Sequence, residues 1–80
     1  TITNKQAKIS VYPNPGNQQF TLEGESVLGK VSVFSSLGEL VFDKTIFTAT
    51  ESINTERWAN GIYVVRFWEK GLSLKVVKQN

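Results

Sequence analysis

Residues 62–78 read Ile-Tyr-Val-Val-Arg-Phe-Trp-Glu-Lys-Gly-Leu-Ser-Leu-Lys-Val-Val-Lys, and this stretch decides the fold class. Its first run, Ile62–Trp68, is rich in β-branched and aromatic residues, which favour strands. The next three residues, Glu69 to Gly71, are a turn signal, and the run Leu72–Lys78 then places leucine and valine side chains on one face. The stretch therefore predicts two strands joined by a short turn.

Shorter runs of the same kind fill the rest of the chain, with turn signals about every ten residues. They predict strands over Lys8–Tyr12, Gln19–Glu23, Lys30–Ser35, Glu39–Lys44 and Ser52–Thr55. Such short strands are stable only when two sheets pack on each other. The predicted fold is therefore all-β, an immunoglobulin-like antiparallel β-sandwich of about seven strands formed by residues 8–80, with residues 1–7 as a linker remnant.

Two local signals refine this prediction. Gly38 lies between the third and fourth predicted strands and supplies the positive φ of a hairpin turn. Residues 55–59 predict one helical turn capped by Thr55, and Asn60-Gly61 would end it.

The composition excludes most catalytic chemistry. The chain has 80 residues, of which 40% are hydrophobic, so it forms one small domain with a modest core. It lacks cysteine and histidine, and with them disulfides, thiolate nucleophiles, the commonest general base and the commonest transition-metal ligand. We expect no enzyme activity and no cofactor. Methionine is absent as well, so we expect the chain to be a domain of a longer protein.

Charge is distributed unevenly although the net charge is only +2. Residues 23–56 carry six acidic side chains against two lysines, whereas residues 57–80 carry five basic side chains against one glutamate. The net charge is too small to indicate nucleic-acid binding. The asymmetry fits either oppositely charged strand faces in one sheet or a contact surface for an anionic partner. No apolar run approaches the roughly 18–20 residues of a membrane helix, so no direct membrane insertion is expected.

The run Ile62–Trp68 has apolar residues on both of its faces. One face holds Tyr63, Val65 and Phe67. The other holds Ile62, Val64 and Trp68 together with Arg66, and a sandwich buries only one face of each strand. Ile62, Val64 and Trp68 are therefore a candidate docking strip. Alternatively, neighbouring side chains or the linker cover them, and Arg66 stacks on Trp68.

Two further patterns are candidate binding or catalytic sites. Glu23 and Glu25 are the nearest pair of carboxylates, but their position beside Gly24 favours a solvated turn over glycoside hydrolysis. Four aromatic residues could make a flat platform on which sugars stack, namely Tyr12, Trp58, Tyr63 and Trp68. Their scatter along the chain favours packing within the fold.

The turn residues carry a family resemblance. Val11-Tyr12-Pro13-Asn14-Pro15 opens the domain, residues 29–41 form a hairpin around Gly38, and Asn60-Gly61-Ile62-Tyr63 precedes the final hairpin. Gly71 and the ending Lys75-Val76-Val77-Lys78 complete the series. In this order, residues 9–78 resemble the type A C-terminal sorting domain of the type IX secretion system of certain Gram-negative bacteria.

The resemblance implies that the domain is a signal for protein export. A cargo domain attached at its N-terminal side would first enter the periplasm, and an outer-membrane translocon would then recognise the sorting domain. A sortase-like surface protease would usually remove the sorting domain afterwards. The cargo would then stay at the cell surface, attached to anionic lipopolysaccharide, or be released. The resemblance assigns translocon recognition to Lys75–Lys78, and it assigns the family motif to Tyr12–Pro15, Gly38, Gly61, Tyr63 and Gly71. Cleavage would fall within or before residues 1–8.

Two other functions stay open from the sequence. One is a carbohydrate-binding or spacer module of a secreted hydrolase, in which Trp58 or Trp68 would contact the glycan. The other is an immunoglobulin-like adhesive domain.

Overall fold

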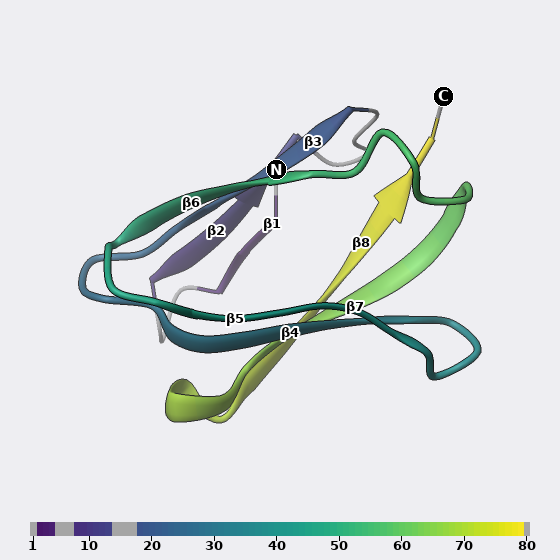
Figure 1. Ribbon diagram of the computed structural model, residues 1–80. Coiled ribbons are helices and arrows are strands. Elements are labelled where there is room, and N and C mark those ends of the chain that lie inside the picture. Colours follow the sequence, from purple (N-terminus) through teal and green to yellow (C-terminus); the bar gives the residue numbers. More distant parts are fainter. Residues whose placement is uncertain (1, 5–7, 14–17, 80) are drawn as a thin grey trace.

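The computed structural model describes residues 2–4, 8–13 and 18–79, which form an antiparallel β-sandwich (Figure 1). One sheet has the strand order β1-β2-β3-β6 and is called the N-terminal sheet. The other, the C-terminal sheet, has the order β5-β4-β7-β8. The elements are β1 (Ile2–Asn4), β2 (Ile9–Tyr12), β3 (Gln19–Glu23), β4 (Gly29–Ser35), β5 (Leu40–Ile46), β6 (Thr50–Asn54), β7 (Gly61–Phe67), the 3₁₀ helix η1 (Trp68–Lys70) and β8 (Leu72–Lys78).

The sheet arrangement confirms the all-β sandwich. The seven predicted strands correspond to β2–β8, and their bounds differ from the predicted ones by one or two residues at most ends. The structure adds β1, which pairs with β2 in the register Ile2 to Val11. The sequence assigned these residues to a linker because a strand of three residues is too short to show a period of two.

Alternation of side chains along the strands builds the core. Of the residues whose burial the structure describes, thirteen apolar ones are buried between the two sheets: Ile9, Val11, Phe20, Leu22, Leu28, Val31, Val33, Ile46, Ile53, Tyr63, Val65, Phe67 and Val76. Each strand from β2 to β8 contributes at least one of them, so the strands hold one another in place through a shared core. Burying a side chain of this size stabilises the fold by roughly 1.5–3 kcal/mol.

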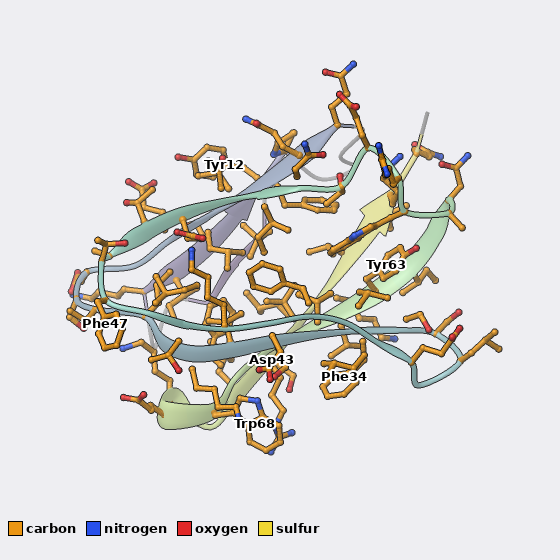
Figure 2. All side chains as sticks on the ribbon, in the orientation of Figure 1. Tyr12, Phe34, Asp43, Phe47, Tyr63 and Trp68 are labelled. Atoms are coloured by element: carbon orange, nitrogen blue, oxygen red, sulfur yellow. The ribbon has the colours of Figure 1, made fainter. Side chains whose placement is uncertain are left out.

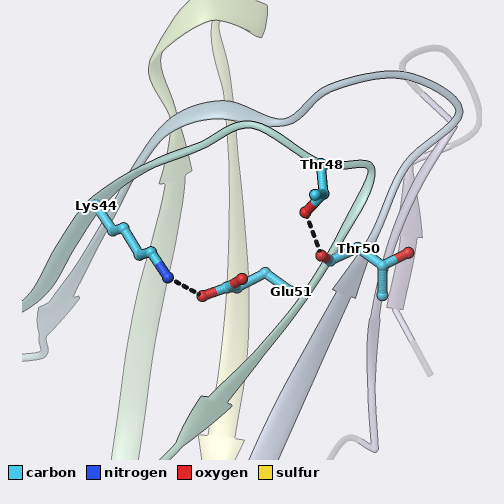
Figure 3. Close-up of polar contacts among 4 residues, drawn as sticks. All are labelled: Lys44, Thr48, Thr50 and Glu51. Carbon is cyan, nitrogen blue, oxygen red and sulfur yellow. Dashed lines mark hydrogen bonds and ion pairs between the residues drawn. The ribbon is translucent and has the colours of Figure 1, made fainter.

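The β5–β6 connection leads from the C-terminal sheet to the N-terminal sheet, and polar contacts link the two strands there (Figure 3). The Lys44 ammonium on β5 lies 2.8 Å from the Glu51 carboxylate on β6, and the Thr48 hydroxyl donates to the Thr50 carbonyl at 2.7 Å. The Leu28 N–H donates to the Thr48 carbonyl at 3.0 Å. Lys44 is half exposed, so the ion pair is worth at most about 1 kcal/mol. It serves chiefly to close this edge of the sandwich.

The predicted turns are largely confirmed. Gly38 has φ +87° in the β4–β5 turn, where the Ser35 N–H donates to the Glu39 carbonyl at 2.8 Å. At residues 55–59 the Trp58 N–H donates to the Thr55 carbonyl at 3.0 Å, which makes a turn rather than a helix. At the start of this turn the Glu56 N–H donates to the Asn54 side chain at 2.9 Å. The helical turn instead follows β7, as η1.

Candidate functional site: the last strand and the outer face of the C-terminal sheet

The acidic residues that the structure describes do not gather into a cluster of metal ligands. Within residues 2–4, 8–13 and 18–79, no group of three or more acidic residues could hold a metal ion. Glu25 forms an ion pair with Lys8 at 3.3 Å, and both side chains are largely exposed, as expected of a solvated turn. In the same residues no helix has the length and apolar character needed to cross a membrane.

The four candidate sugar-stacking aromatics do not form one surface (Figure 2). Tyr63 lies between the sheets, packs on Trp58 with ring centroids 4.9 Å apart, and donates its hydroxyl to the Ala59 carbonyl at 2.5 Å. Trp68 lies on the outer face of the C-terminal sheet, whereas Tyr12 lies on the opposite side of the sandwich. The prediction that the aromatics serve packing is therefore better supported than a shared platform.

Two consecutive hydrogen bonds hold the Trp68 side chain against the outer face of the C-terminal sheet. Its indole N–H donates to the Ser32 hydroxyl at 2.9 Å, and that hydroxyl donates to the Asp43 carboxylate at 2.9 Å. The Arg66 guanidinium lies 4.2 Å from the Trp68 ring centroid, and the Lys30 ammonium lies 5.6 Å away. The stacking of Arg66 on Trp68 is confirmed, whereas the coverage that the same alternative expected is not seen at Ile62, which is 49% exposed. Trp68 is thus held to the sheet, although 45% of its surface stays exposed.

Ile62 and Val64, the other two members of the predicted docking strip, lie on the same outer face. Ile62 is 49% exposed and Val64 is half-buried. The strand register brings three further apolar residues to them: Phe34 opposite Val64, Val77 opposite Ile62, and Leu40 opposite Phe34. The sequence did contain one signal for Phe34, because Val31 and Val33 point inward and therefore direct Ser32 and Phe34 outward.

The last strand, β8, lies at the edge of the C-terminal sheet and pairs there with β7. Its side chains alternate as predicted, with Leu72, Leu74 and Val76 toward the core. Lys75 is exposed on the outer face. Lys78, which the resemblance assigned to translocon recognition together with Lys75, is instead fully buried on the same face as Val76, because the period of two places it there.

A hollow of about 370 Å³ lies between the β4–β5 turn and the loop before β7. Its apolar lining comes from Leu37, Val41, Trp58 and Ile62. Two opposite charges, Glu39 and Arg57, also line it. Ile62 belongs both to this hollow and to the outer face of the sheet, so the hollow adjoins the group of apolar residues around Val64.

The comparison with protein families matches residues 10–79 to the secretion system C-terminal sorting domain, the sorting domain of type IX secretion. The chain belongs to this family. No curated protein and no solved structure is significantly similar to it. As a member, the sorting domain marks an attached cargo protein for export to the cell surface or for secretion, and the secretion system is its partner.

The structure places the sorting domain's motif glycines at turns or strand ends. Gly71 has φ +61° and ends η1, where its N–H donates to the Trp68 carbonyl. Gly61 begins β7 opposite Lys78, and Tyr63 follows in the core. Asn14 and Pro15 lie outside the described residues.

Gly29 has less space for a side chain than the motif glycines, and the sequence did not indicate this. It has φ +75°, and the Glu69 carboxylate fills the space that a Cβ atom would occupy. The same carboxylate accepts the Lys30 N–H at 3.1 Å. The helix η1 is thereby bound to the start of β4, and Lys70 adds a contact to Ser26 at 3.4 Å. These contacts join segments about forty residues apart in sequence.

At the start of its family motif the sorting domain holds Tyr12 beside Glu23. Desolvation, followed by the negative charge and hydrogen bond of Glu23, raises the pKa of Tyr12. Since the folded-state pKa is the higher one, this contribution to stability is present below the ordinary tyrosine pKa of about 10 and is lost as the pH rises through the folded value. We expect Glu23→Gln to lower the pKa of Tyr12, measured by absorbance titration of tyrosinate.

The wild-type protein and Glu23→Gln are both titrated with the additional substitution Tyr63→Phe, because the chain has two tyrosines and only Tyr12 then titrates. A titration curve that Glu23→Gln leaves unmoved would contradict the assigned cause.

Proposed function

We propose that the sorting domain is a non-catalytic signal whose edge strand β8 is read by the outer-membrane translocon. The cargo crosses the periplasm first, and a sortase-like surface protease then cleaves upstream of β2, within or before residues 1–8. The cargo is released or attached to lipopolysaccharide. The observation that carries the recognition step is the position of β8 at the sheet edge, with Lys75 exposed on it.

Strand addition is the mode of recognition that suits this edge. A partner strand would pair with the side of β8 that faces away from β7, and backbone hydrogen bonds would supply the affinity. Leu72 and Leu74 point toward the core but are only half-buried, in contrast to Val76, which is fully buried. An added strand with apolar side chains on the inner face would cover both leucines. On the outer face, a carboxylate beside Lys75 would give a favourable cross-strand pair.

The burial of Val76 and Lys78 changes which part of the Lys75–Lys78 segment a partner can read. Only Lys75 presents an exposed side chain, Val77 is half-buried, and the other two side chains support the fold. Trimming the chain from residue 76 would remove a core side chain, so a loss of export would not separate recognition from folding. A substitution at Lys75 makes that separation.

The test uses a periplasmic reporter fused to residues 1–80 in a host that has type IX secretion. The wild-type fusion is expected at the cell surface, and a reporter without the domain in the periplasm. We expect Lys75→Glu to reduce surface display roughly threefold to tenfold, as for a loss of about 0.7–1.4 kcal/mol in binding. Protease accessibility of the reporter on intact cells measures display.

Two variants control this experiment. Lys44→Glu makes the same change of charge at an exposed lysine on β5, at the opposite edge of the C-terminal sheet, and display should stay at the wild-type level. Lys78→Met should weaken the fold rather than recognition, measured as a lower midpoint of chemical unfolding. Equal display of Lys75→Glu, Lys44→Glu and wild type would reject β8 as the recognised strand.

A further inference from the structure

The two sheets of the sandwich differ in the faces they turn to solvent. The outer face of the N-terminal sheet is formed mostly by hydroxyl, amide and carboxylate side chains, namely Ser10, Tyr12, Gln19, Thr21, Glu23, Ser52 and Asn54. This is the ordinary solvated face of an antiparallel sheet. The outer face of the C-terminal sheet instead carries Phe34, Leu40, Ile62, Val64 and Val77, which we call the apolar strip.

The apolar strip is continuous because its members are cross-strand neighbours. Leu40 pairs with Phe34, and Phe34 pairs with Val64, so one row crosses β5, β4 and β7. In the neighbouring row, Ile62 pairs with Val77 of β8. The strip therefore reaches all four strands of the sheet, and side chains in such positions lie within contact distance of one another.

The strip is also open to solvent. Leu40 is 54% exposed and Ile62 is 49% exposed. Of the other exposed apolar residues, Val27 and Phe47 lie in separate loops, which is normal for a folded protein. Leu37 and Val41 line the hollow beside Ile62, and Trp68 is bound to Ser32. A contiguous exposed group on a rigid sheet is typical of an interaction site. At its Ile62 end the strip runs into the hollow lined by Trp58, which offers a pocket for an anchoring side chain.

The border of the strip is positively charged. Lys75 lies directly beside Val64, and Arg66 and Lys30 lie on the same face in the next rows. Among the described strand residues on the outer face of the C-terminal sheet, Asp43 is the one that carries a carboxylate. This carboxylate already accepts a hydrogen bond from the Ser32 hydroxyl. The surface that complements this border has carboxylates placed around an apolar centre.

We propose that the apolar strip is a docking surface for a component of the export machinery that presents apolar side chains bordered by carboxylates. The inference rests on the proposed function and extends it from the edge of β8 to a whole sheet face. A second copy of the chain fits less well, because a two-fold contact through this face would bring the cations of one copy toward those of the other.

Site-specific photo-cross-linking tests which surface is covered. A photoreactive residue replaces Ile62 in the strip, or Thr21 on the outer face of the N-terminal sheet as the control, in the reporter fusion described above. The expected result is a cross-link from position 62 to an outer-membrane translocon protein, identified with antibodies, and none from position 21. An adduct of two sorting domains, or equal cross-linking from both positions, would overturn the proposal.

A matched pair of double variants tests whether the contact matters. Ile62→Thr with Val64→Thr keeps β-branched residues in β7 and should lower surface display about tenfold, with an unchanged midpoint of unfolding. Val27→Thr with Phe47→Thr removes exposed apolar side chains that lie outside both the strip and the hollow, and should leave display at the wild-type level. Wild-type display of the strip variant would overturn this inference alone, whereas failure of the unsubstituted fusion to reach the surface would overturn the proposed function.

Discussion

Phe67→Ala is expected to lower the free energy of unfolding by about 3–5 kcal/mol, the usual cost of deleting a fully buried aromatic side chain. Phe67 has no exposed surface and lies opposite Val31 on β4 and Leu72 on β8. A domain of 80 residues has a total stability of roughly 4–12 kcal/mol, so this loss removes much of it. Chemical denaturation followed by tryptophan fluorescence measures the change.

Phe47→Ala is the matched control. Phe47 is 81% exposed in the loop after β5, so the same substitution should change the free energy of unfolding by less than about 0.5 kcal/mol. Comparing the surface display of the two variants also shows whether the export machinery recognises the folded domain or a linear segment of it. If it recognises the folded sandwich, Phe67→Ala lowers surface display and Phe47→Ala does not. Equal display of both variants, with Phe67→Ala unfolded, would mean that a linear segment is read.

The parts of the fold that local pattern controls were predictable from the sequence. Alternation in the run Leu72–Lys78 placed Leu72, Leu74 and Val76 on the core face, and the structure confirms this. Continued to the end of the strand, the same alternation places Lys78 on that face as well. The resemblance instead assigned Lys78 to translocon recognition, because it matches the family's terminal lysine-containing strand. The register was the more reliable guide, since β8 keeps its alternation to its end.

The parts that depend on pairing between distant strands were not predictable. Nothing in the run around Ile62 says that Phe34 and Leu40 lie beside it, because the order β5-β4-β7 is set by the whole core. The sequence therefore identified only Ile62 and Val64 of the apolar strip. Alternation also placed Trp68 in the predicted docking strip, but in the structure its indole N–H donates to Ser32 and its ring is stacked against Arg66. A long-range hydrogen bond decided its orientation.

The contact between Gly29 and Glu69 leads to the second large effect. Gly29→Ala is expected to lower the free energy of unfolding by about 2–4 kcal/mol, measured by chemical denaturation. An alanine at φ +75° is strained, and its Cβ atom would overlap the Glu69 carboxylate. The carboxylate can move aside, but it then loses the hydrogen bond from the Lys30 N–H and with it the attachment of η1 to β4.

Gly38→Ala separates the two causes. Gly38 has φ +87°, and no atom of another described residue beyond its chain neighbours lies within 4 Å of the position that an alanine methyl group would take. This variant should therefore lose only the strain energy, about 1–2 kcal/mol. Glu69→Ala removes the hydrogen bond alone. If the carboxylate is the second cause, Gly29→Ala combined with Glu69→Ala costs less than the sum of the two single variants, because the overlap no longer exists. Additive losses would show that backbone strain is the whole effect of Gly29→Ala, with no contribution from the overlap with Glu69.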